Sequence, residues 1–151
     1  MDINNHIPII NYLKTIFFDD ELSFQFLKYL EIVKIEKDDH LFHKGDLSDS
    51  LYIIESGRIT AYIELANNKK HRLAVMCQGT ILGEMGLYTK NIRSASAIAL
   101  ETTVLYKLKF SEFNKMEKLN PELTIYFHKY IINLLSGRIN RINTEIRALL
   151  S

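Results

Sequence analysis

The sequence predicts an α+β protein that is mainly β: an eight-stranded, jelly-roll antiparallel β-barrel with an N-terminal helix before it and C-terminal helices after it. Two observations support this fold class. Between residues 31 and 109, eight short β-prone segments follow one another at close spacing, with turn residues between them. On either side, apolar residues recur every three to four positions, which is the spacing of an amphipathic helix. The last of these helical patterns is long.

The 151 residues are predicted to form a single domain, because no linker or internal repeat divides them. Four parts are expected: an amphipathic lead-in segment at 1–18, a helix at 19–30, the barrel at 31–109, and the C-terminal helices at 110–151. No run of about 18 apolar residues is present, so the sequence predicts no transmembrane segment.

Each element has its own local signal. The acidic residues at 19–21 favour a helix start, because the helix dipole stabilises negative charge there. The strand segments are rich in β-branched and aromatic residues and are bounded by turns such as Ser-Gly at 56–57. Strands are expected near residues 31–35, 41–42, 51–55, 58–65, 72–76, 93–99 and 103–108, with a brief one after Gly79.

Two helix starts follow the barrel. Ser111 is predicted to cap a short helix, and Asn-Pro-Glu at 120–122 places a cap candidate before a proline at the first helical position. A long helix should then run through Leu150. Its apolar stripe is close to a heptad seam, and it predicts packing on the barrel or, for its distal half, on a partner such as a second copy of the chain. The stripe consists of Ile131, Leu135, Ile139, Ile142, Ile146 and Leu149.

Composition and charge exclude several functional classes. A formal net charge of +1 argues against a direct nucleic-acid binder. Cys77 is the only cysteine, so the chain has no internal disulfide and no multi-thiolate zinc site, and a reduced, cytoplasmic setting is expected. The five histidines include no His-x-His pair, which disfavours a cupin-like metal enzyme. We expect no enzymatic activity, no metal and no cofactor.

The most informative stretch is the loop at 82–95, which begins with a glycine-acid pair. Gly83 and Gly86 permit unusual backbone angles and a close approach of main-chain N–H groups to a ligand. A turn of helix begun there directs free N–H groups toward an anion. Glu84 would repel a phosphate and is better suited to accept hydrogen bonds from ribose hydroxyls.

The same loop ends on a cation. Arg93 adds a guanidinium group that matches the geometry of a phosphate. Ser94 and Ala95 are small, so they leave space for a ligand within the barrel. A phosphate site and a ribose site on one loop together indicate a nucleotide.

These residues carry a resemblance to a known family. Gly-Glu-Met-Gly-Leu at 83–87 and Arg-Ser-Ala at 93–95 resemble the phosphate-binding cassette of cyclic-nucleotide-binding domains. That family includes the bacterial catabolite activator protein, protein kinase A regulatory subunits and cyclic-nucleotide-gated channels. The segments at 41–46 and 51–57 agree with this pattern, and the resemblance covers about residues 22–135.

The resemblance implies cAMP or cGMP as the ligand and assigns a role to each residue of the cassette. Glu84, with Gly83 allowing the close approach of the backbone, would bind the ribose. The base would lie under the C-terminal helix. The implied phosphate contacts are Arg93, Ser94, Gly86 and Ala95, and the polar candidates for a lid over the base are Asn140, Asn143 and Thr144. One departure is Ile92, where many members have proline.

A narrower resemblance concerns regulatory modules at the C-terminus of bacterial sulfate-permease-type transporters, and it rests on residues 83–88, 93–96 and 120–123. The implied function is a cytoplasmic sensor that moves its C-terminal helix and regulates a partner domain or a membrane transporter. A barrel that has lost ligand binding and serves only as a dimerisation or scaffold domain remains an open alternative.

Overall fold

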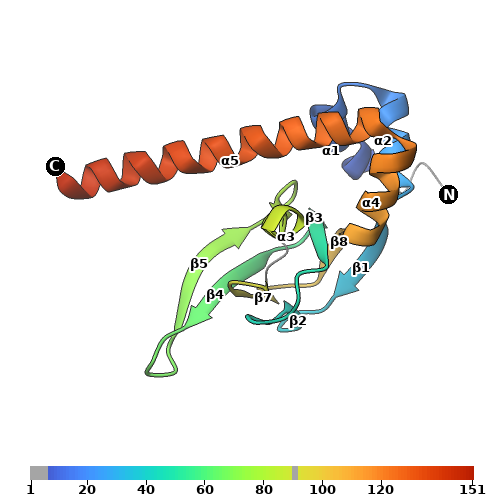
Figure 1. Ribbon diagram of the computed structural model, residues 1–151. Coiled ribbons are helices and arrows are strands. Elements are labelled where there is room, and N and C mark those ends of the chain that lie inside the picture. Colours follow the sequence, from blue (N-terminus) through green and yellow to red (C-terminus); the bar gives the residue numbers. More distant parts are fainter. Residues whose placement is uncertain (1–6, 90–91) are drawn as a thin grey trace.

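The computed structural model describes residues 7–89 and 92–151 (Figure 1). Its strands form two four-stranded antiparallel sheets that face each other as a jelly roll, with the order β1-β8-β3-β6 in one and β2-β7-β4-β5 in the other. The predicted mainly β class, the eight strands and the flanking helices are therefore confirmed. The strands are β1 (Glu31–Ile35), β2 (His40–Phe42), β3 (Ser50–Ser56), β4 (Ile59–Glu64), β5 (Lys70–Met76), β6 (Ile81–Leu82), β7 (Ser96–Ala99) and β8 (Thr103–Lys109).

Strand β3 separates two hydrophobic cores, because its alternate side chains point to opposite faces of its sheet. Tyr52 and Ile54 face the inside of the barrel, where they pack with residues such as Leu105. Leu51 and Ile53 face outward and belong to a second cluster that also contains the helices. Burial on both faces explains why this segment is a nearly continuous apolar run.

The helices that cover this outer face come from both ends of the chain. They are α1 (Ile7–Phe17), α2 (Asp20–Leu27), α4 (Phe110–Leu119) and α5 (Pro121–Leu150). Helix α1 packs against α2 and α5, and Figure 1 shows these helices gathered at one end of the barrel. Phe26 stacks on Phe127 in the middle of this cluster, with ring centroids 5.4 Å apart. Helices α1 and α2 thus share one hydrophobic core with the first part of α5.

The helix starts only partly follow the predicted caps. Asp19 caps α2, and its carboxylate accepts a hydrogen bond of 2.8 Å from the N–H of Leu22. Helix α4 begins at Phe110, so Ser111 lies inside its first turn and is not the cap. Asn120 holds the cap position of α5 without a side-chain cap bond, and its amide NH2 group donates to the Tyr29 hydroxyl.

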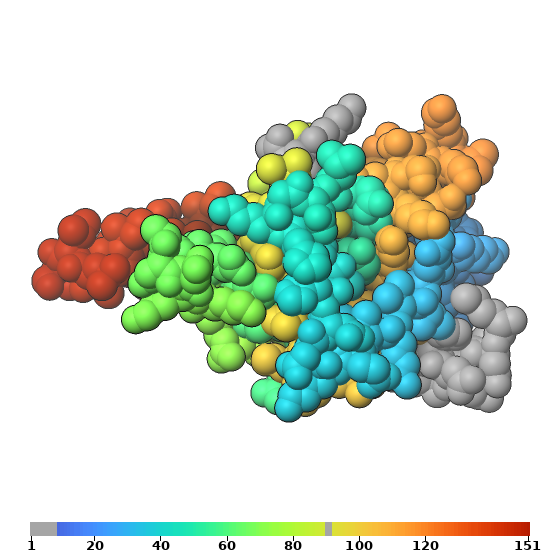
Figure 2. Space-filling model, turned by 90° about the horizontal axis from the view of Figure 1, so that it is seen from below, coloured from blue at the N-terminus to red at the C-terminus, as the bar shows by residue number. Residues whose placement is uncertain are grey.

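Helix α5 is longer than the surface that it covers. Ile131 is buried, Leu135 is half-buried, and the remaining residues of the predicted stripe are exposed. Figures 1 and 2 both show the C-terminal end of α5 projecting beyond the sheets. The apolar stripe therefore divides into a proximal part that packs on the domain and a distal part that faces solvent: Ile139, Ile142, Ile146 and Leu149. Among the described helices, none is long and apolar enough to cross a membrane.

Candidate functional site

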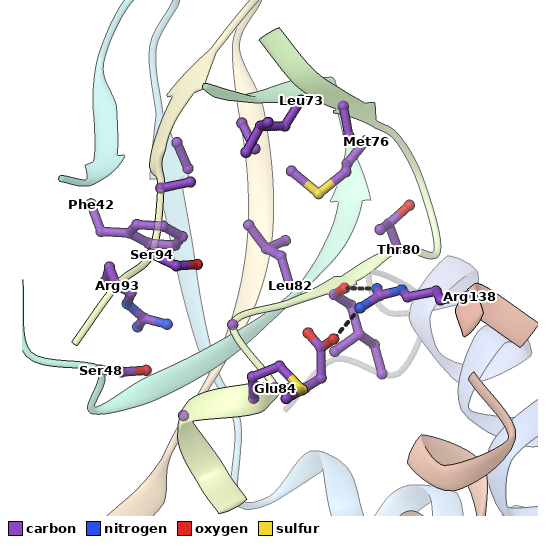
Figure 3. Close-up of a pocket in the computed structure, with 18 of the residues that line it drawn as sticks. Phe42, Ser48, Leu73, Met76, Thr80, Leu82, Glu84, Arg93, Ser94 and Arg138 are labelled. Atoms are coloured by element: carbon purple, nitrogen blue, oxygen red, sulfur yellow. Dashed lines mark hydrogen bonds and ion pairs between the residues drawn. The ribbon is translucent and has the colours of Figure 1, made fainter. Parts of the chain in front are cut away.

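A cavity of about 480 Å³ lies between the β4–β5 hairpin, the loop at 82–95 and α5. Figure 3 shows Arg93 on one side of this cavity and Glu84 with Arg138 on another, with Leu82 between them and Leu73 and Met76 at the top of the view. All six residues assigned to the phosphate and ribose from sequence line it, although they come from opposite ends of the loop. They are Gly83, Glu84, Gly86, Arg93, Ser94 and Ala95.

Arg93 is a buried cation whose hydrogen-bonding capacity is mostly unused. Its side chain is 5% exposed, and Nη2 donates a hydrogen bond of 2.7 Å to the carbonyl of Ser50. In the part of the chain that the structure describes, Arg93 Nε and Nη1 are the buried side-chain polar atoms that have no hydrogen-bond partner. Buried donors are almost always paired in folded proteins, so two orphaned donors on the cavity wall indicate a missing acceptor.

Neighbouring groups hold the Arg93 guanidinium in place without neutralising it. Its central carbon lies 4.3 Å from the centre of the Phe42 ring, a cation–π distance. The Asp49 carboxylate lies 4.0 Å from Arg93 Nη2 and is exposed to water. Burial lowers the pKa of Arg93 from its ordinary value, and the nearby Tyr52 and Asp49 oppose this shift. An arginine remains protonated under all ordinary conditions, so the cavity contains a desolvated positive charge.

The two glycines of the loop are required by close packing. Gly83 has φ +80°, and a Cβ atom there would overlap Arg93 Nη1 and lie 3.1 Å from the Ser50 carbonyl oxygen. Gly86, in the short helix α3 (Met85–Thr89), is buried, and a Cβ there would overlap the Ser48 side chain. Gly83 therefore permits the position of Arg93, and Gly86 allows α3 to lie against the β2–β3 connection.

Glu84 is also buried, with 2% of its surface exposed, and it is paired within the protein. Arg138 of α5 donates from Nη1 to Glu84 Oε1 and from Nη2 to the Ile81 carbonyl oxygen, the latter over 3.2 Å (Figure 3). Sequence reasoning did not identify Arg138 or Arg141 as site residues, yet both line the cavity. No local sequence pattern distinguishes these two arginines from surface residues of the helix. The available signal is general: a buried glutamate needs a positively charged partner.

The lid candidates on α5 lie elsewhere. Asn140, Asn143 and Thr144 are exposed and are not among the residues that line the cavity. The Thr144 hydroxyl donates to the Asn140 carbonyl within the helix over 3.0 Å. In this arrangement, Arg138 and Arg141 are the α5 residues that face the cavity.

An apolar wall completes the cavity and was not anticipated from sequence. It is formed mainly by β5, together with Ala61 of β4, Leu82 of β6 and Ala97 of β7. Leu73 and Val75 are about half exposed, although they belong to a strand of a folded sheet. Their position beside a polar loop suits a flat, partly apolar ligand group.

The site therefore combines a buried guanidinium that has two unused nitrogen atoms, a buried carboxylate and an apolar wall. This arrangement can bind a molecule that has an anionic end, hydroxyl groups and a planar body. The described residues contain no cluster of three or more histidine, cysteine, aspartate or glutamate side chains that could hold a metal ion. Fold and site together define a ligand-binding domain.

Comparison with known proteins identifies the family. The family model described as "Cyclic nucleotide-binding domain" matches residues 32–119. The chain belongs to this family, as its resemblance at the loop had indicated. A cyclic nucleotide-binding domain from Methylobacillus flagellatus KT has the same fold, with a TM-score of 0.83 and 22% identity, over 91% of this chain and 80% of the other.

Two further relatives extend the comparison. The cAMP-bound protein PfPKA-R has a TM-score of 0.68 and 26% identity, over 76% of this chain and 42% of that one. Lysophospholipase nte1 of Aspergillus terreus is 30% identical over 116 residues, which make up 77% of this chain. The match covers only 8% of the length of that relative, so it concerns one domain of a much longer protein.

Proposed function

We propose that the chain is a single-domain sensor that binds cAMP or cGMP in the cavity between the loop at 82–95 and α5. The observation that carries this proposal is the pair of unpartnered, buried nitrogen atoms of Arg93. A cyclic phosphate carries one negative charge and exposed oxygen atoms, so it would both neutralise the guanidinium and accept the unused hydrogen bonds. The family match and the cAMP-bound relative PfPKA-R support the choice of ligand.

The other residues take the roles that the resemblance implies. The N–H of Gly86 and the hydroxyl and N–H of Ser94 add hydrogen bonds to the phosphate, with Ala95 against it. Gly83 keeps the backbone close, and Glu84 accepts a hydrogen bond from the ribose 2′-hydroxyl. The apolar wall on β5 then lies in reach of the base. Serine at position 94 slightly favours cAMP over cGMP.

Ligand binding would be transmitted through α3 to α5. The Tyr88 hydroxyl of α3 and His128 Nδ1 of α5 form a hydrogen bond of 2.9 Å. A rearrangement of the loop would therefore move or break a contact with the long helix. A shift of α5 can be driven only by a difference in ligand affinity between its two positions. We propose that this movement regulates a cytoplasmic partner, either a further domain or a membrane transporter.

The distal part of α5 supports a second candidate function. Four large apolar residues are exposed there at a heptad-like spacing, which suits a homodimer through this helix. A domain that dimerises in this way without binding a ligand would be a scaffold rather than a sensor. Sedimentation of the protein with and without nucleotide separates the two functions.

Calorimetric titration of cAMP and cGMP tests the sensor directly. The wild type should bind one of them, and Arg93→Ala should bind about 10- to 100-fold more weakly, because charged hydrogen bonds contribute about 1.5–3 kcal/mol each. Arg147→Ala is the matched control, since it also removes one positive charge, but from an exposed α5 residue that is not among those lining the cavity. The absence of binding to the wild type at millimolar nucleotide would refute the sensor. Equal affinity of Arg93→Ala would refute the phosphate assignment.

A further inference from the structure

The Phe42 ring holds the charge of Arg93 without using any of its hydrogen-bond donors. The central carbon of the guanidinium lies over this ring, 4.3 Å from the ring centre (Figure 3). A ring face attracts a cation through its π electrons, so it stabilises the charge and leaves the N–H groups free. A carboxylate in the same place would instead accept bonds from Nε and Nη1, which have no hydrogen-bond partner among the described residues.

The position of the ring depends on an irregularity in β2. His40 pairs with Ile98 of β7. Phe42, two positions later, pairs with Ala97, so two steps along β2 match one step along β7. Such a β-bulge redirects side chains and is common next to functional sites. Phe42 and Ala97 both line the cavity, so the bulge places an aromatic ring against the ligand site.

The segment that follows Phe42 fixes the main chain of Arg93. The N–H of Gly45 donates to the Arg93 carbonyl over 2.9 Å. The N–H of Arg93 donates in turn to the Asp46 carbonyl over 2.7 Å. Residues 42–46 therefore position both the main chain of Arg93 and its guanidinium group.

Asp49 offers the guanidinium an alternative position. Its carboxylate lies 4.0 Å from Nη2, and its side chain is 75% exposed, whereas that of Arg93 is 5% exposed. A guanidinium that turned toward this carboxylate would gain a closer ion pair and hydration, but its donors would leave the cavity. The Phe42 ring opposes this movement, because a cation–π contact stabilises a desolvated cation more than an exposed one.

We propose that Phe42 is a positioning residue of the nucleotide site, which keeps Arg93 turned into the cavity and away from Asp49 in the ligand-free protein. This inference rests on the proposed function for its ligand. A binding group that is already ordered raises affinity, because binding no longer has to order it. Loss of the ring should therefore weaken nucleotide binding, and mainly where Asp49 can attract the guanidinium.

A double-mutant cycle measured by calorimetry tests this role with whichever of cAMP and cGMP the wild type binds. Phe42→Leu should bind the nucleotide about 3- to 30-fold more weakly, the range of a cation–π contact. In the Asp49→Asn background, the same substitution should weaken binding less than about 3-fold. Phe24→Leu is the matched control, since it removes a half-buried ring of α2 and should leave the affinity unchanged. An undiminished loss in the Asp49→Asn background would overturn the positioning role.

Fluorination of the ring separates the π interaction from packing. Mono-, di- and trifluorinated phenylalanine at position 42 keep nearly the same shape, but each fluorine atom withdraws charge from the ring face. Nucleotide affinity should fall stepwise along this series, whereas a purely apolar contact would show no such fall, and that result would overturn the proposal. A wild type that binds neither nucleotide would refute the sensor and this role together. Unweakened binding by Phe42→Leu, beside a wild type that binds, would refute the positioning role alone.

Discussion

At the scale of single residues, Arg93 shows how a side chain suited to ligand binding can lower the stability of the ligand-free protein. A guanidinium that is buried with two unused nitrogen atoms loses hydration, and it gains in return one hydrogen bond, ring contacts and a long ion pair with the exposed Asp49. Residues of this kind persist where their cost is recovered upon ligand binding. The stability of the empty protein and its affinity should therefore respond differently to substitution at this position.

Arg93→Met separates these two effects. An apolar chain of similar length removes the desolvated charge, so the free energy of unfolding of the empty protein should change by no more than about 1 kcal/mol. The increase in melting temperature that cyclic nucleotide gives the wild type should disappear. Thermal unfolding with and without cAMP or cGMP measures both quantities. A variant that loses stability while keeping the nucleotide-induced increase would show that Arg93 is a structural residue.

Gly83→Ala tests the packing of the loop behind Arg93. The residue has φ +80°, and its Cβ would overlap the guanidinium, so we expect a loss of about 1–3 kcal/mol in the free energy of unfolding together with weaker nucleotide binding. Gly137→Ala is the matched control in α5, where nothing lies within 4 Å of the added atom. The control should stabilise the protein by about 0.5–1 kcal/mol and leave binding unchanged. Urea denaturation and calorimetry would contradict the account if both variants behaved alike.

His40 gives the stability a dependence on pH. Burial lowers its pKa from the ordinary 6.5, and the positive charges of His43 and Lys70 lower it further, against an opposing contribution from Glu64. The unfolded chain therefore takes up a proton first, and the free energy of unfolding should fall as the pH drops below about 6.5. Urea denaturation at several pH values should show a smaller fall in His40→Gln. An identical pH dependence in the variant would exclude His40 as its source.

At the scale of elements, α5 combines two different surfaces in one helix. Its proximal half completes the helical core, for example through Phe127 and Ile131. Its distal half exposes an apolar stripe and is linked to the barrel through Arg138. A helix with this division can change what its free half contacts without disturbing the core.

The exposed stripe predicts self-association of the wild type through α5. Ile142→Gln with Ile146→Gln should make the protein monomeric at concentrations where the wild type dimerises, because both residues lie in the distal part of the stripe. The melting temperature of the dilute protein should change little, since neither side chain is buried. Sedimentation equilibrium measures the association. A wild type that stays monomeric at all concentrations would instead assign the stripe to another partner.

Much of the fold could be predicted at this scale, because local patterns determine it. The alternation in β4 and the proline at the start of α5 depend on neighbouring residues only. The caps were less predictable: helix α4 begins one residue before Ser111, and Asn120 makes no cap bond but donates from its amide to Tyr29, 91 positions away in sequence. Arg138 shows the same limit at the site, since its partner Glu84 is 54 positions away and no helical pattern reveals it.

At the scale of the whole molecule, one cavity joins the two sheets, the loop at 82–95 and the long helix. The loop contributes both its charges, Glu84 and Arg93, and the helix contributes the cation that holds Glu84. A ligand in this cavity would therefore contact the barrel and α5 at once.

The central claim is that a cyclic phosphate binds the free nitrogen atoms of Arg93. Its most direct test is an NMR titration that follows the Arg93 Nε–H group and the backbone amides during addition of cAMP, and of cGMP in parallel. The Arg93 Nε–H resonance and the Gly86 amide should shift saturably with one of the nucleotides, while amides of α1, on the far side of the core, should stay in place. An unshifted Arg93 Nε–H resonance in a protein saturated with nucleotide, or the absence of any shift at millimolar concentration, would contradict the account.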